Sequence, residues 1–281
     1  MTEVRHTEVL GAHAPEVSAA KARRWGSFYF MEHMLRGMRA YLVTIVVTSV
    51  GNPLLYLFSM GVGLASIVDR NPSAHFGGVG YLAFAAPALL VSSAVMTCAN
   101  EMMFPVMDGF KWRRIYYGPH VTPLVPGQLA AGHVMAVGVR LLVQCSVFFL
   151  IMLAFGAAAS PVAWLLIPVG VLAGLAVGTP LMAYAAGIQK ENFQFSMIQR
   201  FIIMPLFLFS GTFYPLETMP TAMQWIGWIS PLWHGNQLGR LVSVGLSEPG
   251  WLVAVHVLYL AALGVGGIVW ARRNYTKRMS A

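Results

Sequence analysis

Eight histidines are the residues of this chain most able to bind a metal ion, but their spacing does not favour a site. None stands at HxxxH spacing from another histidine or at a zinc-type His/Cys spacing, the patterns that bring ligands together on a helix or turn. The sequence therefore predicts no metal site. It indicates histidines scattered at interfaces, namely His6, His13, His33, His75, His120, His133, His234 and His256.

Nucleotide hydrolysis would need a phosphate-binding loop that ends in Gly-Lys-Ser or Gly-Lys-Thr. No Gly-Lys dipeptide occurs in the sequence. The stretch from Gly61 to Ser66 partly resembles a dinucleotide fingerprint, but it ends an apolar run and has no strand–helix–strand context. We expect the chain to have no ATPase site, no catalytic residue and no cofactor of its own.

Arg140 is the one charge that lies inside an apolar run. A charge at the centre of a bilayer costs about 2.5–3.5 kcal/mol on insertion scales. If the run ends near Gly156, Arg140 lies within about one helical turn of the cytoplasmic end and can snorkel to water. The alternative is that Arg140 lines the cytoplasmic mouth of a substrate path.

The 10 acidic residues fall in loops or at the ends of apolar runs. Ion-coupled carriers usually keep carboxylates near the middle of the bilayer, so this placement disfavours such a carrier.

The composition indicates an integral membrane protein. Of 281 residues, 57% are hydrophobic and 10% are charged, and the mean hydropathy is +0.66. Soluble domains carry roughly 25% charged residues, so these charges cannot cover a water-facing surface. Two cysteines, Cys98 and Cys145, lie in apolar runs and are expected to be packing residues.

Six apolar stretches approach the roughly 20 residues that a helix needs to cross a bilayer. They are residues 41–64, 80–100, 134–156, 162–186, 199–215 and 251–270. We therefore predict an all-α integral membrane fold with six transmembrane helices in a single domain over residues 22–271. A disordered cytoplasmic segment, residues 1–21, precedes it, and a cytoplasmic tail, residues 272–281, follows it.

The basic residues predict the orientation of these spans. Fifteen of the 18 lysines and arginines fall in the terminal segments and in the connections after the second and fourth spans. Because basic loops stay in the cytoplasm, both termini are expected there, in a multi-pass protein of the plasma membrane. The net charge of +8 thus reflects topology and does not indicate a nucleic-acid partner.

Residues 22–38 place aromatic and apolar side chains at helical spacing, with charged side chains between them. The aromatic ones are Trp25, Phe28 and Tyr29. This pattern is typical of an amphipathic helix lying on the cytoplasmic leaflet. An N-terminal extension of the first span is the alternative.

Residues 101–127 mix charges with aromatic side chains and end in three prolines and Gly127. We predict a short aromatic and basic helix along the cytoplasmic membrane surface, stopped by the prolines, with a shape suited to docking a cytoplasmic partner. A solvated loop with membrane-anchoring aromatics is the alternative.

Residues 208–245 contain further prolines together with three tryptophans. This composition favours a broken, partly re-entrant pair of short helices at the outer face. The residues concerned are Gly211, Phe213, Tyr214, Pro215, Glu217, Pro220, Trp225, Trp228 and Pro231.

In the fourth span, Gly170, Gly174 and Gly178 form a small-residue stripe for close helix packing, either within the subunit or between subunits.

Residues 101–127 and 208–245 together resemble the membrane-spanning subunit of ABC-2 type ATP-binding-cassette exporters, in the branch of nodulation lipo-oligosaccharide exporters and daunorubicin-resistance permeases. The most specific part runs from Ser210 to Leu216, followed by Met219-Pro220, Trp228, Pro231-Leu232 and His234. The stretch from Phe110 to Gly127 is similar as well. Gln128 departs from the pattern, because relatives commonly have an acidic residue there.

The resemblance implies a permease that exports an amphipathic or lipid-like compound, such as a drug, antibiotic, glycolipid or lipo-oligosaccharide. It implies two such membrane subunits, identical or paralogous, and two nucleotide-binding subunits that hold ATP and Mg²⁺. It also implies that the N-terminal helix and residues 101–118 contact the ATPase. The coupling candidates are Glu101, Phe104, Asp108, Phe110, Lys111, Trp112, Arg113, Arg114 and Tyr117. The alternatives are an ion-coupled secondary transporter, a membrane-embedded lipid-modifying enzyme and a scaffold that transports nothing.

Overall fold

The computed structural model describes residues 15–69, 76, 78–120, 122–190 and 193–280, and over these ranges the chain forms helices and loops without a strand. Five helical runs are long and apolar enough to cross a membrane: Ala19–Val68, Tyr81–Lys111, Pro126–Ala154, Ala163–Gly187 and Gly250–Met279. A sixth apolar run, Gln194–Phe209, is shorter. The all-α membrane fold is thus confirmed, and the sixth span stays a prediction.

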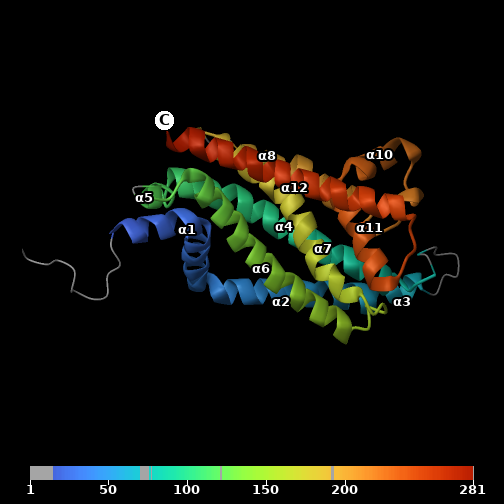
Figure 1. The fold of residues 1–281 in the computed structure, drawn as a ribbon. Coiled ribbons are helices and arrows are strands. Elements are labelled where there is room, and N and C mark those ends of the chain that lie inside the picture. The colour runs from blue at the N-terminus through green and yellow to red at the C-terminus, as the bar shows by residue number, and fades with distance from the viewer. Residues whose placement is uncertain (1–14, 70–75, 77, 121, 191–192, 281) are drawn as a thin grey trace, which may run out of the picture.

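The first run contains several helices in succession. It begins within α1 (Pro15–Met38) and continues through the 3₁₀ turn η1 (Arg39–Tyr41), α2 (Leu42–Phe58), the π-helical η2 (Ser59–Leu64) and α3 (Ala65–Val68). The chain changes direction between α1 and α2 (Figure 1). Helix α1 is therefore a separate segment beside the bundle and does not prolong α2 in a straight line.

The long helices among the remaining elements alternate in direction along the bundle (Figure 1). They are α4 (Tyr81–Lys111), α5 (Tyr117–His120), α6 (Pro126–Ala154), η3 (Ala163–Leu165), α7 (Leu166–Gly187), α8 (Gln194–Ile198), η4 (Gln199–Ile203), α9 (Met204–Phe209), η5 (Leu216–Thr218), α10 (Thr221–Ile229), α11 (Pro231–Val244) and α12 (Gly250–Met279). We call the end that carries α1, α5 and the C-terminus the terminal end. The opposite end, with α3, α10 and the start of α12, is the distal end.

Helix α7 forms the centre of the bundle, where it packs against α4, α6, α11 and α12. A Cβ atom at Gly170 would lie 2.9 Å from both Cys145 Sγ and Leu90 Cδ2, and one at Gly174 would lie 3.2 Å from the main-chain oxygen of Ala94. The stripe of small residues thus packs within one subunit, against α4 and α6. Cys98 and Cys145 are free, buried thiols, as expected for packing residues.

Helix α1 crosses α6 at a second close contact. A Cβ at Gly132 of α6 would lie 2.6 Å from the main-chain oxygen of Ser27 and 2.9 Å from Phe30 Cβ. Phe30 is 2% exposed. The inward face of α1 is therefore formed by Phe30 and its neighbours, whereas Trp25 and Tyr29 point away from the bundle.

Several helices continue past the apolar residues that defined the predicted spans. Helix α4 runs without interruption to Lys111, so residues 101–111 prolong the second span and form no separate surface helix. Helix α12 reaches Met279 and includes most of the predicted tail. Helix α1 begins at Pro15, so residues 15–21 are helical. Residues 1–14, His75 and Arg70 lie outside the described residues.

The contact between α1 and α6 predicts opposite effects for two glycines on the same helix. Gly132→Ala should lower the melting temperature of the purified protein, since overpacking a close contact costs about 1–3 kcal/mol. Gly138→Ala, where a Cβ would have no neighbour within 4 Å, should leave the melting temperature unchanged or raise it, because alanine favours helix. Equal shifts for the two variants would contradict the packing described here.

Candidate functional site

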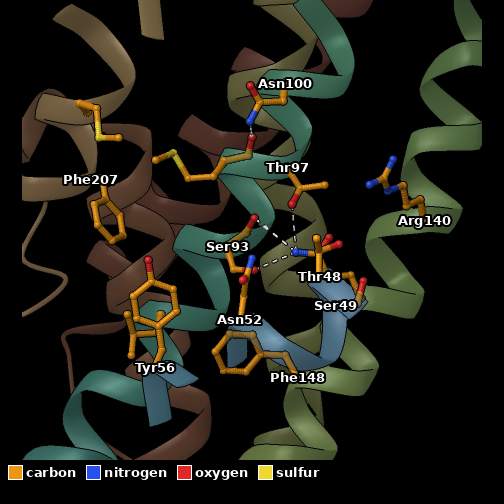
Figure 2. Close-up of a pocket in the computed structure, with 14 residues that line it drawn as sticks. Thr48, Ser49, Asn52, Tyr56, Ser93, Thr97, Asn100, Arg140, Phe148 and Phe207 are labelled. Atoms are coloured by element: carbon orange, nitrogen blue, oxygen red, sulfur yellow. Dashed lines mark hydrogen bonds between the residues drawn. The ribbon is translucent and has the colours of Figure 1, made fainter. Parts of the chain in front are cut away.

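A cavity of about 280 Å³ opens between α2, α4, α6 and α9 (Figure 2). Residues four apart on a helix share one face, and this spacing brings polar side chains into the cavity from three helices. The lining consists of Thr48, Ser49, Asn52, Tyr56, Leu89, Ser93, Met96, Thr97, Asn100, Arg140, Gln144, Phe148, Met204 and Phe207. One lining thus combines hydroxyl, amide and guanidinium groups with aromatic and methionine side chains.

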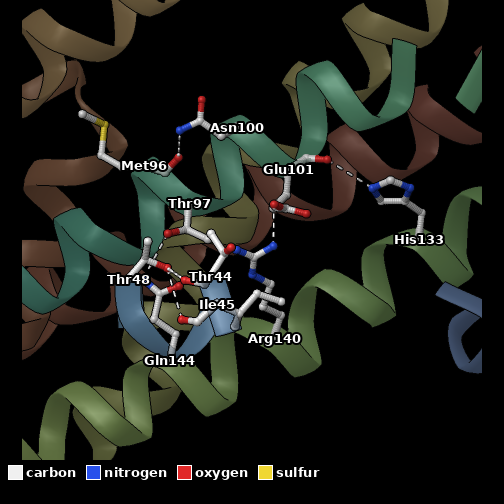
Figure 3. A network of polar contacts seen from close by, with 10 residues as sticks. All are labelled: Thr44, Ile45, Thr48, Met96, Thr97, Asn100, Glu101, His133, Arg140 and Gln144. Carbon is white, nitrogen blue, oxygen red and sulfur yellow. Dashed lines mark hydrogen bonds and ion pairs between the residues drawn. The ribbon is translucent and has the colours of Figure 1, made fainter. Parts of the chain in front are cut away.

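Gln144 holds the polar wall of the cavity together. Its Nε2 donates hydrogen bonds to Ser93 Oγ at 2.8 Å and to Thr97 Oγ1 at 3.0 Å on α4 (Figure 3 shows the Gln144–Thr97 contact). The side chain is 8% exposed. Because an amide buried in an apolar bundle needs partners, these bonds fix α6 against α4 at this depth.

Arg140 forms an ion pair across the same helix interface. Its Nη1 lies 2.5 Å from Glu101 Oε1, and both side chains are about one-fifth exposed, at 20% and 22% (Figure 3). Helix α6 begins at Pro126, so Arg140 stands halfway along it and not within a turn of its end. Snorkelling of Arg140 to water stays a prediction, and its partner within the bundle is Glu101, which lies inside α4.

His133 links this ion pair to the terminal end. Its Nε2 lies 3.2 Å from the main-chain oxygen of Glu101, and its Nδ1 lies 2.8 Å from the Tyr116 hydroxyl. A carbonyl can only accept, so His133 donates from Nε2 and accepts from Tyr116 at Nδ1. Burial raises the pKa of the Tyr116 phenol, which keeps it a neutral donor.

Tyr116 also stands at the centre of an aromatic cluster. Its ring centroid lies 5.8 Å from Phe30 of α1, 4.6 Å from Phe110 of α4 and 5.0 Å from Tyr275 of α12. Gly109 leaves the room for this ring, since a Cβ there would overlap it. The connection between α4 and α5 is therefore packed against three separate helices.

The predicted coupling residues are not brought together in one place. Glu101 lies at the cavity, Phe104 contacts Phe195 of α8 at a ring distance of 5.2 Å, and Phe110 is buried. Asp108 Oδ2 forms an ion pair with Arg113 Nε at 3.1 Å. The exposed members that follow Phe110 form what we call the terminal-end surface: Lys111, Trp112, Arg113, Arg114 and Tyr117.

Trp25, Phe28 and Tyr29 of α1 are 44%, 47% and 41% exposed. They therefore remain available to a lipid surface, and the interfacial role stays a prediction.

Gln128, the residue that departs from the family pattern, forms hydrogen bonds that connect α6 to α1. Its Oε1 accepts from the Val125 main-chain N–H at 3.1 Å, and its Nε2 donates to the Arg23 main-chain oxygen at 2.6 Å. The amide thus starts α6 and ties it to α1.

At the distal end, Arg240 of α11 organises the turn after α9. It is 3% exposed, donates to the main-chain oxygens of Gly211 and Phe84, and stacks on the Phe84 ring with its Cζ 3.8 Å from the centroid. Gly211 has φ +66°, a left-handed conformation that favours glycine. An arginine buried in this way stabilises the turn by satisfying its carbonyls.

The predicted outer residues divide between this turn and the helices that follow. Gly211 is buried, Tyr214 donates to the Leu208 main-chain oxygen at 3.1 Å, and Pro220 and Pro231 stand at the starts of α10 and α11. A second cavity of about 190 Å³ includes Pro215 and Glu217 in its lining. Trp225 and Trp228 are more than half exposed, and Phe213 is half-buried. Two short helices are present as predicted, and their re-entry into a membrane stays a prediction.

The histidines are not simply scattered at interfaces. His133, His234 and His256 are buried, and their ring nitrogens contact polar groups. Within the described residues, no group of three or more His, Cys, Asp or Glu side chains is arranged to hold a metal ion.

Most residues of the cavity lining were not predicted from the sequence. Thr48, Asn52, Ser93, Thr97 and Gln144 are uncharged and fall inside apolar runs, where a charge is a stronger signal than an uncharged polar side chain. The spacing of four residues between Ser93 and Thr97, and between Arg140 and Gln144, was a detectable signal of polar helix faces.

Comparison with known proteins matches residues 30–242 to the ABC-2 type transporter family. Three similar relatives are each called Nodulation protein J. The protein from Sinorhizobium fredii is 25% identical, with 82% of this chain and 86% of the relative covered. The one from Rhizobium meliloti is 22% identical, with 89% and 92% covered, and the one from Rhizobium leguminosarum bv. trifolii is 26% identical, with 69% and 71% covered.

The family match extends over well more than half of the chain, and it includes the helices that line the cavity and most of those at both ends of the bundle. This chain therefore belongs to the ABC-2 type transporter family and is a membrane-spanning permease subunit.

Proposed function

We propose that this permease exports an amphipathic or lipid-like compound, driven by ATP hydrolysis on a separate cytoplasmic nucleotide-binding subunit. The observation that carries the proposal is the cavity between α2, α4, α6 and α9. Polar side chains inside a membrane bundle are costly unless they pair or serve a substrate path. Here they are gathered on one cavity wall.

The two kinds of lining match two parts of an amphipathic cargo. Asn52, Thr97 and Arg140 offer hydrogen bonds to a polar headgroup, and Arg140 Nε is buried without a protein partner. Met96, Phe148 and Phe207 offer adaptable apolar contact to a hydrocarbon or ring system. Because Glu101 already neutralises Arg140, the wall has no net charge from this pair.

The terminal-end surface is the proposed docking site for the ATPase. It combines three basic side chains with Trp112, which is 53% exposed, and Tyr117, which is 37% exposed. Exposed aromatic and arginine side chains are typical anchors of protein interfaces. Tyr116 lies beneath this surface and contacts His133, which contacts Glu101. A displacement of Tyr116 would therefore be transmitted to Glu101 and the cavity.

The assembly proposed here has two membrane subunits and two nucleotide-binding subunits in the plasma membrane, with ATP and Mg²⁺ on the latter. Both termini would face the cytoplasm. Helix α2 supports an arrangement with a second membrane subunit or lipid on its outer face, because Val43, Leu55 and Phe58 are 78%, 71% and 60% exposed. Nothing in this proposal requires bond-making chemistry on the chain itself.

Filling the cavity should stop transport without disturbing assembly. Asn52→Trp on α2 should lower the transport rate of the reconstituted complex by about tenfold or more, which corresponds to about 1.4 kcal/mol. Leu150→Trp on α6, at a position that is 63% exposed and outside the cavity lining, is the matched control and should transport normally. Equal rates for the two variants would remove the cavity from the substrate path.

Removing the exposed tryptophan at the terminal end should weaken ATPase binding. Trp112→Ala is expected to lower the affinity for the nucleotide-binding subunit roughly tenfold, as for an aromatic interface anchor. Trp251→Ala changes a tryptophan that is 69% exposed at the distal end, and should bind the ATPase normally. Unchanged co-purification of Trp112→Ala would exclude the terminal-end surface as the docking site.

The rival functions can be separated by what accompanies the native protein. Purification in mild detergent should recover an ATP-binding-cassette subunit, with this permease alone or with a related one. A protein that remains alone after cross-linking would instead favour an ion-coupled carrier or a membrane-embedded lipid enzyme. Recovery of the ATPase without cargo-stimulated turnover would favour a scaffold.

A further inference from the structure

A buried pair of histidines lies at the distal end, apart from the cavity and the terminal-end surface. His234 of α11 is 6% exposed and His256 of α12 is 0% exposed. Their Nδ1 atoms lie 2.5 Å apart. On the outer sides of the pair, His256 Nε2 lies 3.1 Å from Glu248 Oε2, and His234 Nε2 lies 3.0 Å from the main-chain oxygen of Trp228. All four ring nitrogens therefore have a partner.

These partners determine how many protons the pair can hold. The main-chain oxygen of Trp228 accepts a hydrogen bond, so His234 Nε2 carries a proton. Glu248 also accepts from Gln237 Nε2 and keeps contact with the surroundings, which favours its ionised form, and an ionised carboxylate requires a proton on His256 Nε2. The contact between the two Nδ1 atoms needs one proton, because two would repel and none would leave no hydrogen bond. With Glu248 ionised, the arrangement therefore needs three ring protons, whereas two neutral imidazoles would supply only two.

We propose that His234, His256 and Glu248 form a proton-binding site, in which the two rings share one positive charge that the Glu248 carboxylate balances. The charge belongs to the pair, since the proton between the Nδ1 atoms can reside on either ring. The ligand of this site is a single proton, and the inference does not depend on the proposed transport function.

The surroundings favour one positive charge and oppose a second. Trp228 is in the last turn of α10, where the negative end of the helix dipole favours a cation. The Tyr259 hydroxyl donates to the neighbouring Ile229 main-chain oxygen at 2.6 Å, and its ring lies 4.4 Å from that of His234. A second imidazolium would face the first at contact distance in a buried environment, which disfavours it.

The other charged groups nearby connect the site to the turn after α9. Glu248 Oε1 accepts from Gln237 Nε2 at 2.7 Å, and Gln237 Oε1 accepts from Arg240 Nη1 at 3.1 Å. Glu217 lies within electrostatic range of Arg240. The Glu248 side chain is 14% exposed, which gives the site contact with the surroundings for proton exchange. One proton therefore links α10, α11 and α12.

Nitrogen-15 NMR of histidine-labelled protein in lipid nanodiscs tests the proton count directly at pH 7. The signals of the pair are identified as those lost in His234→Gln and His256→Gln. We expect protonated Nε2 on both rings and one proton on the two Nδ1 atoms, seen as one protonated and one unprotonated nitrogen or as two averaged signals. Two neutral rings, each with one protonated nitrogen, would overturn the proposal, and so would four protonated nitrogens.

A pair of glutamate variants tests the role of the counter-charge in the same spectra. Glu248→Gln should remove the third proton at pH 7 and leave two neutral rings. Glu217→Gln, which changes an exposed distal carboxylate outside hydrogen-bond contact with the pair, should leave the three-proton pattern intact. Loss of the third proton in both variants, or in neither, would contradict the assignment of Glu248.

Discussion

The interior of this bundle depends on one constraint: a polar group inside it must find its partner within the protein, because lipid cannot supply one. Gln144 meets this condition on α4, Arg140 on Glu101, and His133 on Tyr116 and the Glu101 main chain. These contacts join α6 to α4 and to the connection that follows α4. The polar side chains therefore fix how the helices are arranged, and the apolar ones fill the space between them.

Small residues make these polar contacts possible by allowing the backbones to approach. Gly170 and Gly174 bring α7 against α4 and α6, and Gly132 admits α1 beside α6. Dispersion and polar contacts, rather than burial from water, hold such helices together in a membrane. The close approach at α7 leaves α2 and α9 at the edge, where they complete the cavity.

The sequence was sufficient to predict the helical class, the approximate spans and the two unusual segments, because hydropathy and proline placement are local signals. It was insufficient for helix ends, since α4 and α12 continue into polar residues such as Lys111 and Lys277 while keeping their backbone hydrogen bonds. Helix α6 likewise begins at Pro126, before its apolar run, so Arg140 stands halfway along the helix. The partners of His133 and Arg240 are far away in sequence, so no spacing rule could have found them.

Helix α4 joins the separate polar groups into one mechanical unit. Its distal end provides the Phe84 carbonyl and ring to Arg240, its middle provides Ser93 and Thr97 to Gln144, and its terminal half provides Glu101 to Arg140 and His133. A continuous helix transmits displacement along its axis better than a loop, and α4 is unbroken over 31 residues. The unbroken α4 carries the cavity wall on the same helix as Lys111, where the terminal-end surface begins, and its other end reaches the turn held by Arg240.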